Sequence, residues 1–254
     1  MAAEEKAIDA LHQFELVPAL GAIGESVRFS QSNLFMLIAM GLITWLMVAG
    51  TARRAIVPGR LQALAEASYE FVHDIVVGQV GDEGKRFFPF VFSLFMFVLF
   101  GNLLGLLPWA FTFTSHIAVT FALAAIVFVL ITVVGLVIHG THWFGYFFPE
   151  GAPKLLAPLI IPIEIISYLS RPVSLSVRLF ANMVAGHVML IVFASFVVML
   201  STSSVLGALG YVGAALPLAI NVALVGFELL VAFLQAYVFA ILTSIYLPDA
   251  VHLH

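Results

Sequence analysis

The fold of this chain is decided by two long apolar segments, Leu155–Leu200 (LLAPLIIPIEIISYLSRPVSLSVRLFANMVAGHVMLIVFASFVVML) and Val205–Leu247 (VLGALGYVGAALPLAINVALVGFELLVAFLQAYVFAILTSIYL). The first is interrupted only by three prolines, and the second only by one. A continuous helix of either length would be roughly 60 Å long, about twice the thickness of the hydrocarbon core of a bilayer. Each segment is therefore either two shorter pieces or one long helix that crosses the membrane strongly aslant.

The composition places the whole chain in a membrane. Of its 254 residues 63% are hydrophobic and 9% charged, against roughly 45–50% and 25% in soluble domains. The 161 residues from 87 to 247 include only six charged ones, which are Glu150, Lys154, Glu164, Arg171, Arg178 and Glu228. This number is too small to cover a water-facing surface, so a soluble enzyme is excluded. Apolar blocks of about 20 residues favour helices over a β-barrel.

We expect an all-α integral membrane protein with one membrane domain over residues 33–247. A polar N-terminal tail (1–32) precedes it, and a short C-terminal tail (248–254) follows. The apolar blocks predict three shorter membrane spans and a C-terminal hairpin of two long, strongly tilted helices, at 33–50, 87–107, 117–138, 155–200 and 205–247. Long helices are favoured in the hairpin by the spacing of its few polar residues, although Pro172 could break the first.

Residues 61–80 differ from the spans because they contain both apolar and charged positions. Apolar residues recur at helical spacing at positions 61, 64, 71, 72 and 75, and most of the polar ones fall elsewhere on the helical wheel. This pattern is typical of an amphipathic helix at the membrane surface.

The basic residues predict the orientation of the chain. Six of the ten Lys and Arg residues fall in loops on one side, namely Arg53, Arg54, Arg60, Lys85, Arg86 and Lys154. The loops near 108–116 and 201–204 on the other side contain none. The positive-inside rule therefore predicts an N-terminus outside the cell and a C-terminus in the cytoplasm.

Several functions are excluded by what the sequence lacks. A net charge of −4 without a long basic run excludes a nucleic-acid partner. The chain has no Cys, and no phosphate loop or hydrolase motif is present, so we expect neither catalysis nor a cofactor. His139 and His142 lack a nearby third ligand, so we expect no metal site.

Polar residues at membrane depth are the candidate functional residues, because each ionisable group there costs about 2.5–3.5 kcal/mol on insertion scales. Glu164, Arg171 and Arg178 are spaced by seven and share a helical stripe, which Ser174 and Asn182 widen. Arg178 lies near the middle of its segment with no acidic residue within a helical turn. A missing counter-charge predicts a partner subunit. Glu164 and Arg171 could also be residues whose long side chains reach toward the membrane–water interface.

A second stripe lies on the last segment. Asn221, Glu228 and Gln235 are also spaced by seven, and two antiparallel helices would bring the two stripes together. His187 lies nine residues from Arg178, on the opposite face of the helix. Buried amides also join helices by hydrogen bonds, and Asn102 in GNLLG could occupy a close packing face of this kind.

These residues resemble subunit a of the F-type ATP synthases. The matching segments are 171–187 (RPVSLSVRLFANMVAGH), 228–239 (ELLVAFLQAYVF), 101–108 (GNLLGLLP) and 243–247 (TSIYL). The resemblance extends over nearly the whole chain and is closest in style to alphaproteobacterial sequences.

The resemblance implies a non-catalytic, proton-translocating subunit of an enzyme complex, whose long hairpin curves along a rotating ring of c subunits. Arg178 would face the carboxylates of this ring between two offset aqueous half-channels. Asn182, His187, Glu228 and Gln235, with Asn221 and Tyr237 as weaker candidates, would lie near the arginine or in the outer half-channel, which Asn102 would also line. Glu164 would belong to the inner exit, with Arg171 and Ser174 on the same stripe.

In one respect the chain departs from many bacterial members, which have a carboxylate where this chain has His187 and a histidine where it has Glu228. The pair is exchanged, as in the mitochondrial versions, so we assign the two residues a joint relay role. A titratable histidine also favours H⁺ over Na⁺ as the transported ion.

The resemblance also implies partners and a location. The partners are the c-subunit ring, the peripheral-stalk subunit b and the other subunits of the complex. The location is a bacterial inner membrane rather than a mitochondrial one. The alternative function is a stand-alone ion-coupled transporter, which would also use buried Arg, Glu and His residues. The chain, however, has neither an internal repeat nor matched broken helices.

Overall fold

The computed structural model describes residues 30–52, 55–107, 110–147, 156–202 and 207–251. These residues are almost entirely helical, and the order of elements is α2 (Gln31–Thr51), α3 (Arg60–Val80), η2 (Asp82–Arg86), α4 (Phe88–Gly105), η3 (Phe113–Ser115), α5 (Ile117–His139), η4 (Gly140–Phe147), α6 (Ala157–Ser201) and α7 (Ala208–Val251). Five of the helices, all except α3, are long and apolar enough to cross a membrane. The prediction of an all-α membrane protein is confirmed.

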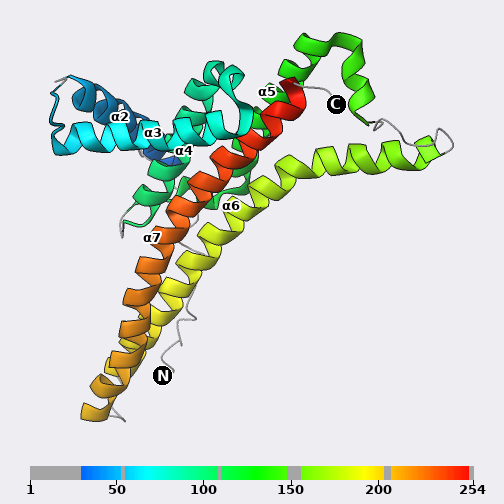
Figure 1. The fold of residues 1–254 in the computed structure, drawn as a ribbon. Helices are drawn as coiled ribbons and strands as arrows, with labels where there is room; N and C mark the ends of the chain where they lie inside the picture. The colour runs from blue at the N-terminus through cyan, green and yellow to red at the C-terminus, as the bar shows by residue number, and fades with distance from the viewer. Residues whose placement is uncertain (1–29, 53–54, 108–109, 148–155, 203–206, 252–254) are drawn as a thin grey trace.

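The two long C-terminal segments form α6 and α7, each a single helix, and they lie side by side as a hairpin (Figure 1). Helix α6 is continuous through Pro162 and Pro172. It bends in its first half, so that its beginning turns away from α7 (Figure 1). Proline removes a backbone hydrogen bond, which accounts for a bend in this half of the helix. The tilt of the hairpin in the bilayer stays a prediction.

The second half of α7 lies at the centre of the molecule, where it packs against α3, α4, α5 and α6. Ala232, Ala236 and Ala240 are fully buried, and so is Leu247. These alanines follow one another at intervals of four, so they form one narrow face of the helix. Small residues on a helix face let neighbouring helices approach closely, which is how membrane helices gain packing energy.

Helix α3 packs on the rest of the protein through one face, and part of its apolar stripe stays exposed. Leu61 and Leu64 are 42% and 53% exposed. The buried positions are Ala65, Val72, Val76 and Val80, with Phe71 and Ile75 half-buried. At its first turns α3 meets α2 closely, since a Cβ on Gly50 would lie 2.8 Å from the Ala65 Cβ. The small side chain of Ala65 permits this close approach.

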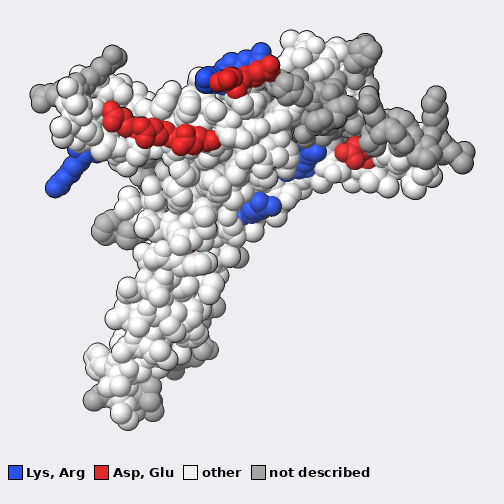
Figure 2. Space-filling view, in the orientation of Figure 1, with Lys and Arg blue, Asp and Glu red and all other residues white. Residues whose placement is uncertain are grey.

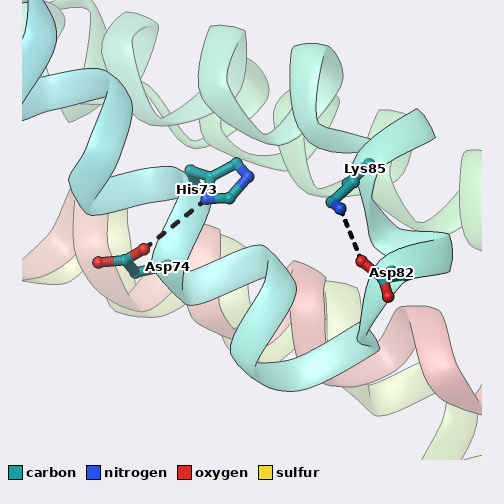
Figure 3. A network of polar contacts seen from close by, with 4 residues as sticks. All are labelled: His73, Asp74, Asp82 and Lys85. Atoms are coloured by element: carbon teal, nitrogen blue, oxygen red, sulfur yellow. Dashed lines mark ion pairs between the residues drawn. The ribbon is translucent and has the colours of Figure 1, made fainter.

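Charged residues gather at one end of the molecule (Figure 2). Acidic side chains follow α3, and both signs surround η2, where the Lys85 Nζ atom lies 2.6 Å from Asp82 Oδ1. On α3 the His73 Nδ1 atom lies 3.7 Å from Asp74 Oδ1 (Figure 3). The far half of the α6–α7 hairpin shows no charged side chain in this view. This one-sided distribution fits a chain that exposes one polar end at a membrane surface.

Helix α7 extends past the predicted end at residue 247 and includes Pro248. Leu247 is fully buried and Ala250 is 3% exposed, so packing against the core carries the helix through the proline. The other helix ends differ from the predicted ranges by only a few residues. Most of the predicted N-terminal tail, together with Arg53, Arg54, Glu150 and Lys154, lies outside the described residues.

Candidate functional site

Arg178 lies on the exposed face of α6, in a segment whose surroundings are apolar. Ser174 and Asn182, one turn before and after it, are also exposed. In the part of the chain that the structure describes, no carboxylate lies within ion-pair distance of its guanidinium. A cation at membrane depth is strongly destabilised without a counter-charge or water. This face of α6 therefore requires a partner or solvent from outside the described chain.

Glu228 lies on the inner side of α7 and is 6% exposed. Its carboxyl group lies against the backbone of Gly186 on α6, where a Cβ would clash with Oε1 and approach Cδ to 3.0 Å. Both carboxylate oxygens are buried without a hydrogen-bond partner among the described residues. A carboxyl group in this position must hold a proton or contact water, because an isolated buried charge is too costly.

Asn102 links α4 to the same region of α7. It is fully buried, and its Nδ2 atom donates a hydrogen bond to the Ala232 carbonyl at 3.3 Å. Ala232 lies one turn after Glu228 and just before Gln235, which is 8% exposed. The Asn102 Oδ1 atom has no partner within the described chain. Asn102 on α4 thus contacts the buried side of α7, on which the predicted residues Glu228 and Gln235 lie.

Tyr237 lies apart from this group, because its ring packs on α3. The ring centroid is 5.9 Å from that of Phe71. The structure therefore gives Tyr237 an aromatic packing contact between α7 and α3.

A cavity of about 460 Å³ opens between α4, α6 and α7, near the start of α2. His187 and Asn221 are among the residues that line it, together with Gly105 and Thr112. The His187 Nε2 atom lies 3.0 Å from the Thr112 Oγ1 atom. The Asn221 Oδ1 atom is buried with no partner among the residues described. Arg178 is not among the lining residues, so His187 and Arg178 serve different spaces.

Sequence analysis missed a group of polar residues in the segment between α4 and α5. Thr112, Thr114 and Ser115 are 6%, 0% and 3% exposed, so the connection between the two helices is packed into the protein. His116 stacks on Phe111 at 5.1 Å, and burial lowers the pKa of this histidine. The alternation of aromatic and hydroxyl residues in the sequence FTFTSH was the available signal for an inserted segment.

Buried polar atoms without hydrogen-bond partners occur on several elements. Within the described ranges they belong to Asn102, Thr114, His116, Asn221 and Glu228. Unpaired buried polar groups are rare in native proteins and mark places where water or a transported ion is held. The described residues contain no group of three potential metal ligands.

Arg171 is held by aromatic rings. Its guanidinium lies 4.6 Å from the Tyr246 ring centroid on α7 and 5.5 Å from that of Tyr168 on α6. The Tyr168 hydroxyl is 2.6 Å from Thr132 Oγ1 on α5. Arg171 thus joins α6 to α7, and Tyr168 joins α6 to α5. Glu164, seven residues earlier, is half-buried in the first part of α6.

Comparison with known families decides what kind of protein this is. Residues 33–248, which cover most or all of each of the five long apolar helices described, match the family model described as ATP synthase A chain. The chain belongs to the ATP synthase A chain family. The match covers α6, α7 and all eleven of the candidate residues proposed from the sequence.

Individual members of the family are similar to the chain over almost its full length. A protein named ATP synthase subunit a from Granulibacter bethesdensis is 62% identical over 99% of this chain and 100% of that protein. The proteins of the same name from Acidiphilium cryptum and Gluconobacter oxydans are 58% and 60% identical, over 99% and 96% of this chain and 100% and 97% of theirs. All three sources are alphaproteobacteria, as the sequence resemblance implied.

Proposed function

We propose that the chain is the stator subunit a of the membrane sector of an ATP synthase, and that it conducts protons to and from the carboxylates of a c-subunit ring. The observation that carries the proposal is Arg178, an exposed cation in the middle of an apolar helix with no ion-pair partner in the described chain. A ring carboxylate would supply the missing counter-charge. The full-length similarity to proteins named ATP synthase subunit a supports the same conclusion.

The cavity beside His187 would form the outer half-channel. Its lining includes Gln31 at the start of α2 and Gly105 at the end of α4, and both helix ends face the outer side in the predicted orientation. From the cavity, protons would pass His187 and Glu228 as a joint relay. Asn102, Asn221 and Gln235 would hold water along this path. Asn182 would lie where the path meets the c-subunit ring.

The inner half-channel would open along the first part of α6, where Glu164 and Ser174 lie. Tyr237 and Arg171 would support the helices beside the paths, because their visible contacts are with aromatic rings.

Arg178 would separate the two half-channels. A unit charge that crosses 100 mV changes free energy by about 2.3 kcal/mol, so a continuous water path through the subunit would dissipate the gradient. A fixed cation repels protons in a medium of low dielectric constant, and it stabilises an ionised ring carboxylate beside it. The ring would then move only after proton exchange on the correct sides. Arg suits this role better than Lys, because a guanidinium group keeps its charge and does not act as a proton donor.

The proposal includes partners and an orientation. The exposed face of α6 around Arg178 would contact the c ring, and subunit b of the peripheral stalk would hold the chain against rotation. The chain would span a bacterial inner membrane with the N-terminus outside and the C-terminus in the cytoplasm, in line with the basic residues around α3 and η2. The other subunits of the complex would act through these contacts.

The test is ATP-driven proton pumping in inverted membrane vesicles that contain either the wild-type chain or Arg178→Ala. Quenching of a pH-sensitive dye measures pumping, immunoblotting measures assembly, and ATP hydrolysis is recorded in parallel. We expect assembled Arg178→Ala complexes to hydrolyse ATP without pumping. Pumping at the wild-type rate would make Arg178 a structural cation and would overturn the proposal. A stand-alone transporter would move ions in vesicles that lack the other subunits.

A further inference from the structure

We propose that Thr120 and Ser176 are positioning residues for Arg178: their hydroxyl pair ties α6 to the first turn of α5 and fixes the rotation of α6, so that Arg178 points out of the subunit. The inference rests on the proposed function, in which Arg178 faces the c-subunit ring. It goes beyond that function because it assigns a role to two buried residues, which would touch neither the ring nor the transported proton.

The pair is a direct contact between two helices. Thr120 on α5 is fully buried, and Ser176 on α6 is 1% exposed. The Thr120 Oγ1 atom lies 3.2 Å from the Ser176 Oγ atom, and it also lies 3.2 Å from the carbonyl oxygen of Ile117. Further along α6 the Ser195 hydroxyl instead donates to the Ile191 carbonyl, on its own helix. The Ser176 hydroxyl therefore acts between helices.

Ser176 and Arg178 lie on opposite sides of α6. Two residues along an α-helix correspond to a rotation of about 200°. The exposure of the neighbouring side chains agrees, because Leu175 and Leu179 are buried with Ser176, whereas Val177 is 44% exposed beside Arg178. A contact that holds Ser176 against α5 therefore directs Arg178 away from the other helices of the subunit.

The hydroxyl pair supplies a directional contact that the apolar residues of this segment do not provide. Apolar side chains lie on both sides of α6, since Leu175 is buried while Val173 and Val177 are 50% and 44% exposed. Lipid tails are as apolar as these side chains, so apolar burial alone does not favour one side over the other. Turning Ser176 toward lipid would break its hydrogen bond to Thr120 in a medium without water to replace it.

The position of the pair along α6 gives it leverage on Arg178. Pro172 lies one turn before Ser176, and a proline removes a backbone hydrogen bond, so the helix is weakest at this point. Ser176 lies between this proline and Arg178. Helix α5, to which Ser176 is tied, also packs against the central helix α7. The pair therefore holds the segment that carries Arg178 in place, relative to the core of the subunit.

The experiment removes the hydroxyl groups one at a time. Ser176→Ala deletes one oxygen atom and favours a helix, Thr120→Val keeps the branched shape, and Thr120→Ser keeps the hydroxyl. The matched control is Thr132→Val, because the Thr132 Oγ1 atom lies 2.6 Å from the Tyr168 hydroxyl between the same two helices, on the other side of Pro172. The measurement is the number of protons pumped per ATP hydrolysed in inverted vesicles, with assembly determined by immunoblotting.

We expect Ser176→Ala and Thr120→Val each to lower pumping per ATP about three- to tenfold, which is the effect of one hydrogen bond between membrane helices on an equilibrium. Thr120→Ser and Thr132→Val should couple like the wild type once assembled. The double variant should lose no more than the more affected single one, because both break the same bond. Normal coupling in both hydroxyl deletions, multiplied losses in the double variant, or an equal loss in Thr132→Val would overturn the inference.

A cross-link measures the rotation of α6 directly, which separates positioning from a general effect on stability. The chain has no cysteine, so Val177→Cys introduces a single thiol beside Arg178. Cysteines are placed in turn at each position within one helical turn of the c-subunit carboxylate, and copper phenanthroline with oxygen oxidises the thiol pairs to disulfides. At the position of highest yield, adding Ser176→Ala should lower the yield at least about threefold, and adding Thr132→Val should not change it. An unchanged yield with Ser176→Ala would overturn the positioning role.

Two outcomes distinguish failure of this inference from failure of the proposed function. If Val177→Cys cross-links at no position, or if assembled Arg178→Ala complexes pump normally, the proposed function fails and the inference fails with it. If Arg178→Ala loses pumping while Ser176→Ala and Thr120→Val lose only assembly, the hydroxyl pair is a structural contact and the positioning role alone is overturned.

Discussion

The carboxyl group of Glu228 lies against the backbone of Gly186, so that α7 places its one membrane-embedded acid next to the residue that precedes His187. The fit depends on the missing side chain, since a Cβ on Gly186 would approach Cγ of Glu228 to 3.2 Å and would lie closer still to Oε1. In the proposed function, Gly186 therefore sets the position of one member of the proton relay.

Gly186→Ala should displace the Glu228 carboxyl group and lower proton conduction at least about tenfold, since small displacements of reacting groups cost large factors in rate. Alanine favours a helix over glycine by roughly 1 kcal/mol, so a weaker helix would not explain the loss. The matched control is Gly213→Ala on α7, where a Cβ would lie 4.0 Å from the nearest atom, on Leu200. Equal conduction in both variants would contradict the prediction.

The joint role of His187 and Glu228 predicts that their order along the path is free. We expect His187→Glu and Glu228→His each to reduce ATP-driven pumping, because each removes one of the two groups. The double variant should restore a large part of the rate, since it again provides one acid and one imidazole. Pumping and assembly are measured together in inverted vesicles. A double variant as inactive as its less active parent would show that each position needs its own residue.

The cavity beside His187 predicts water access from one side of the membrane. The chain has no cysteine, so a single introduced thiol reports its own surroundings. Ala194→Cys lines the cavity and should react with a thiolate-specific, membrane-impermeant reagent added from the outer side. Ala236→Cys, at a fully buried position on α7, is the control and should not react. Reaction of Ala194→Cys only from the cytoplasmic side would reverse the proposed orientation.

Arg171 and Arg178 should differ in the property that they affect. The Arg171 guanidinium lies over the rings of Tyr168 and Tyr246, contacts worth about 0.5–2 kcal/mol each. Arg171→Gln should therefore lower the amount of assembled subunit in the membrane, whereas pumping per assembled complex should fall much less than in Arg178→Ala. Immunoblotting and dye quenching separate the two quantities. Complete loss of coupling in assembled Arg171→Gln complexes would place Arg171 in the proton path.

The ion pair between Asp82 and Lys85 predicts a weak pH dependence at the surface. The hydrogen bond and positive charge of Lys85 lower the pKa of Asp82 below its usual value. A lowered pKa means that the pair stabilises the folded state above the usual Asp pKa and that this contribution is lost as the pH falls through the lowered value. Both side chains of the pair are exposed to solvent, so Asp82→Asn should pump like the wild type and melt at the same temperature in high salt. A large melting difference in high salt would indicate a buried role.

The existence of the helices followed from the sequence, because apolar blocks have only one stable backbone arrangement in lipid. Every backbone group must be hydrogen-bonded within the segment, so length and hydropathy suffice to predict a span. The same reasoning explains why the two long segments and the rare polar residues within them could be recognised. The cost of polar groups in lipid marks such residues without any knowledge of their neighbours.

The tertiary structure alone decided which faces of these helices meet. On α3 the sequence shows an apolar stripe that includes Leu61 and Leu64, but only the structure shows that both stay exposed while Ala65 packs against α2 at Gly50. Lipid is as apolar as leucine, so the hydrophobic pattern cannot tell a lipid-facing side from a protein-facing one.

The same limit applied to the candidate site. The sequence identified Arg178, His187 and Glu228 by their chemistry, but it did not single out Thr112, which lies in the connection between two apolar segments. Only the packed structure brings Thr112 between Gly105 and His187, and Glu228 against Gly186. Such contacts depend on the register of helices far apart in sequence, which is set by side-chain packing across the whole bundle and by no local pattern.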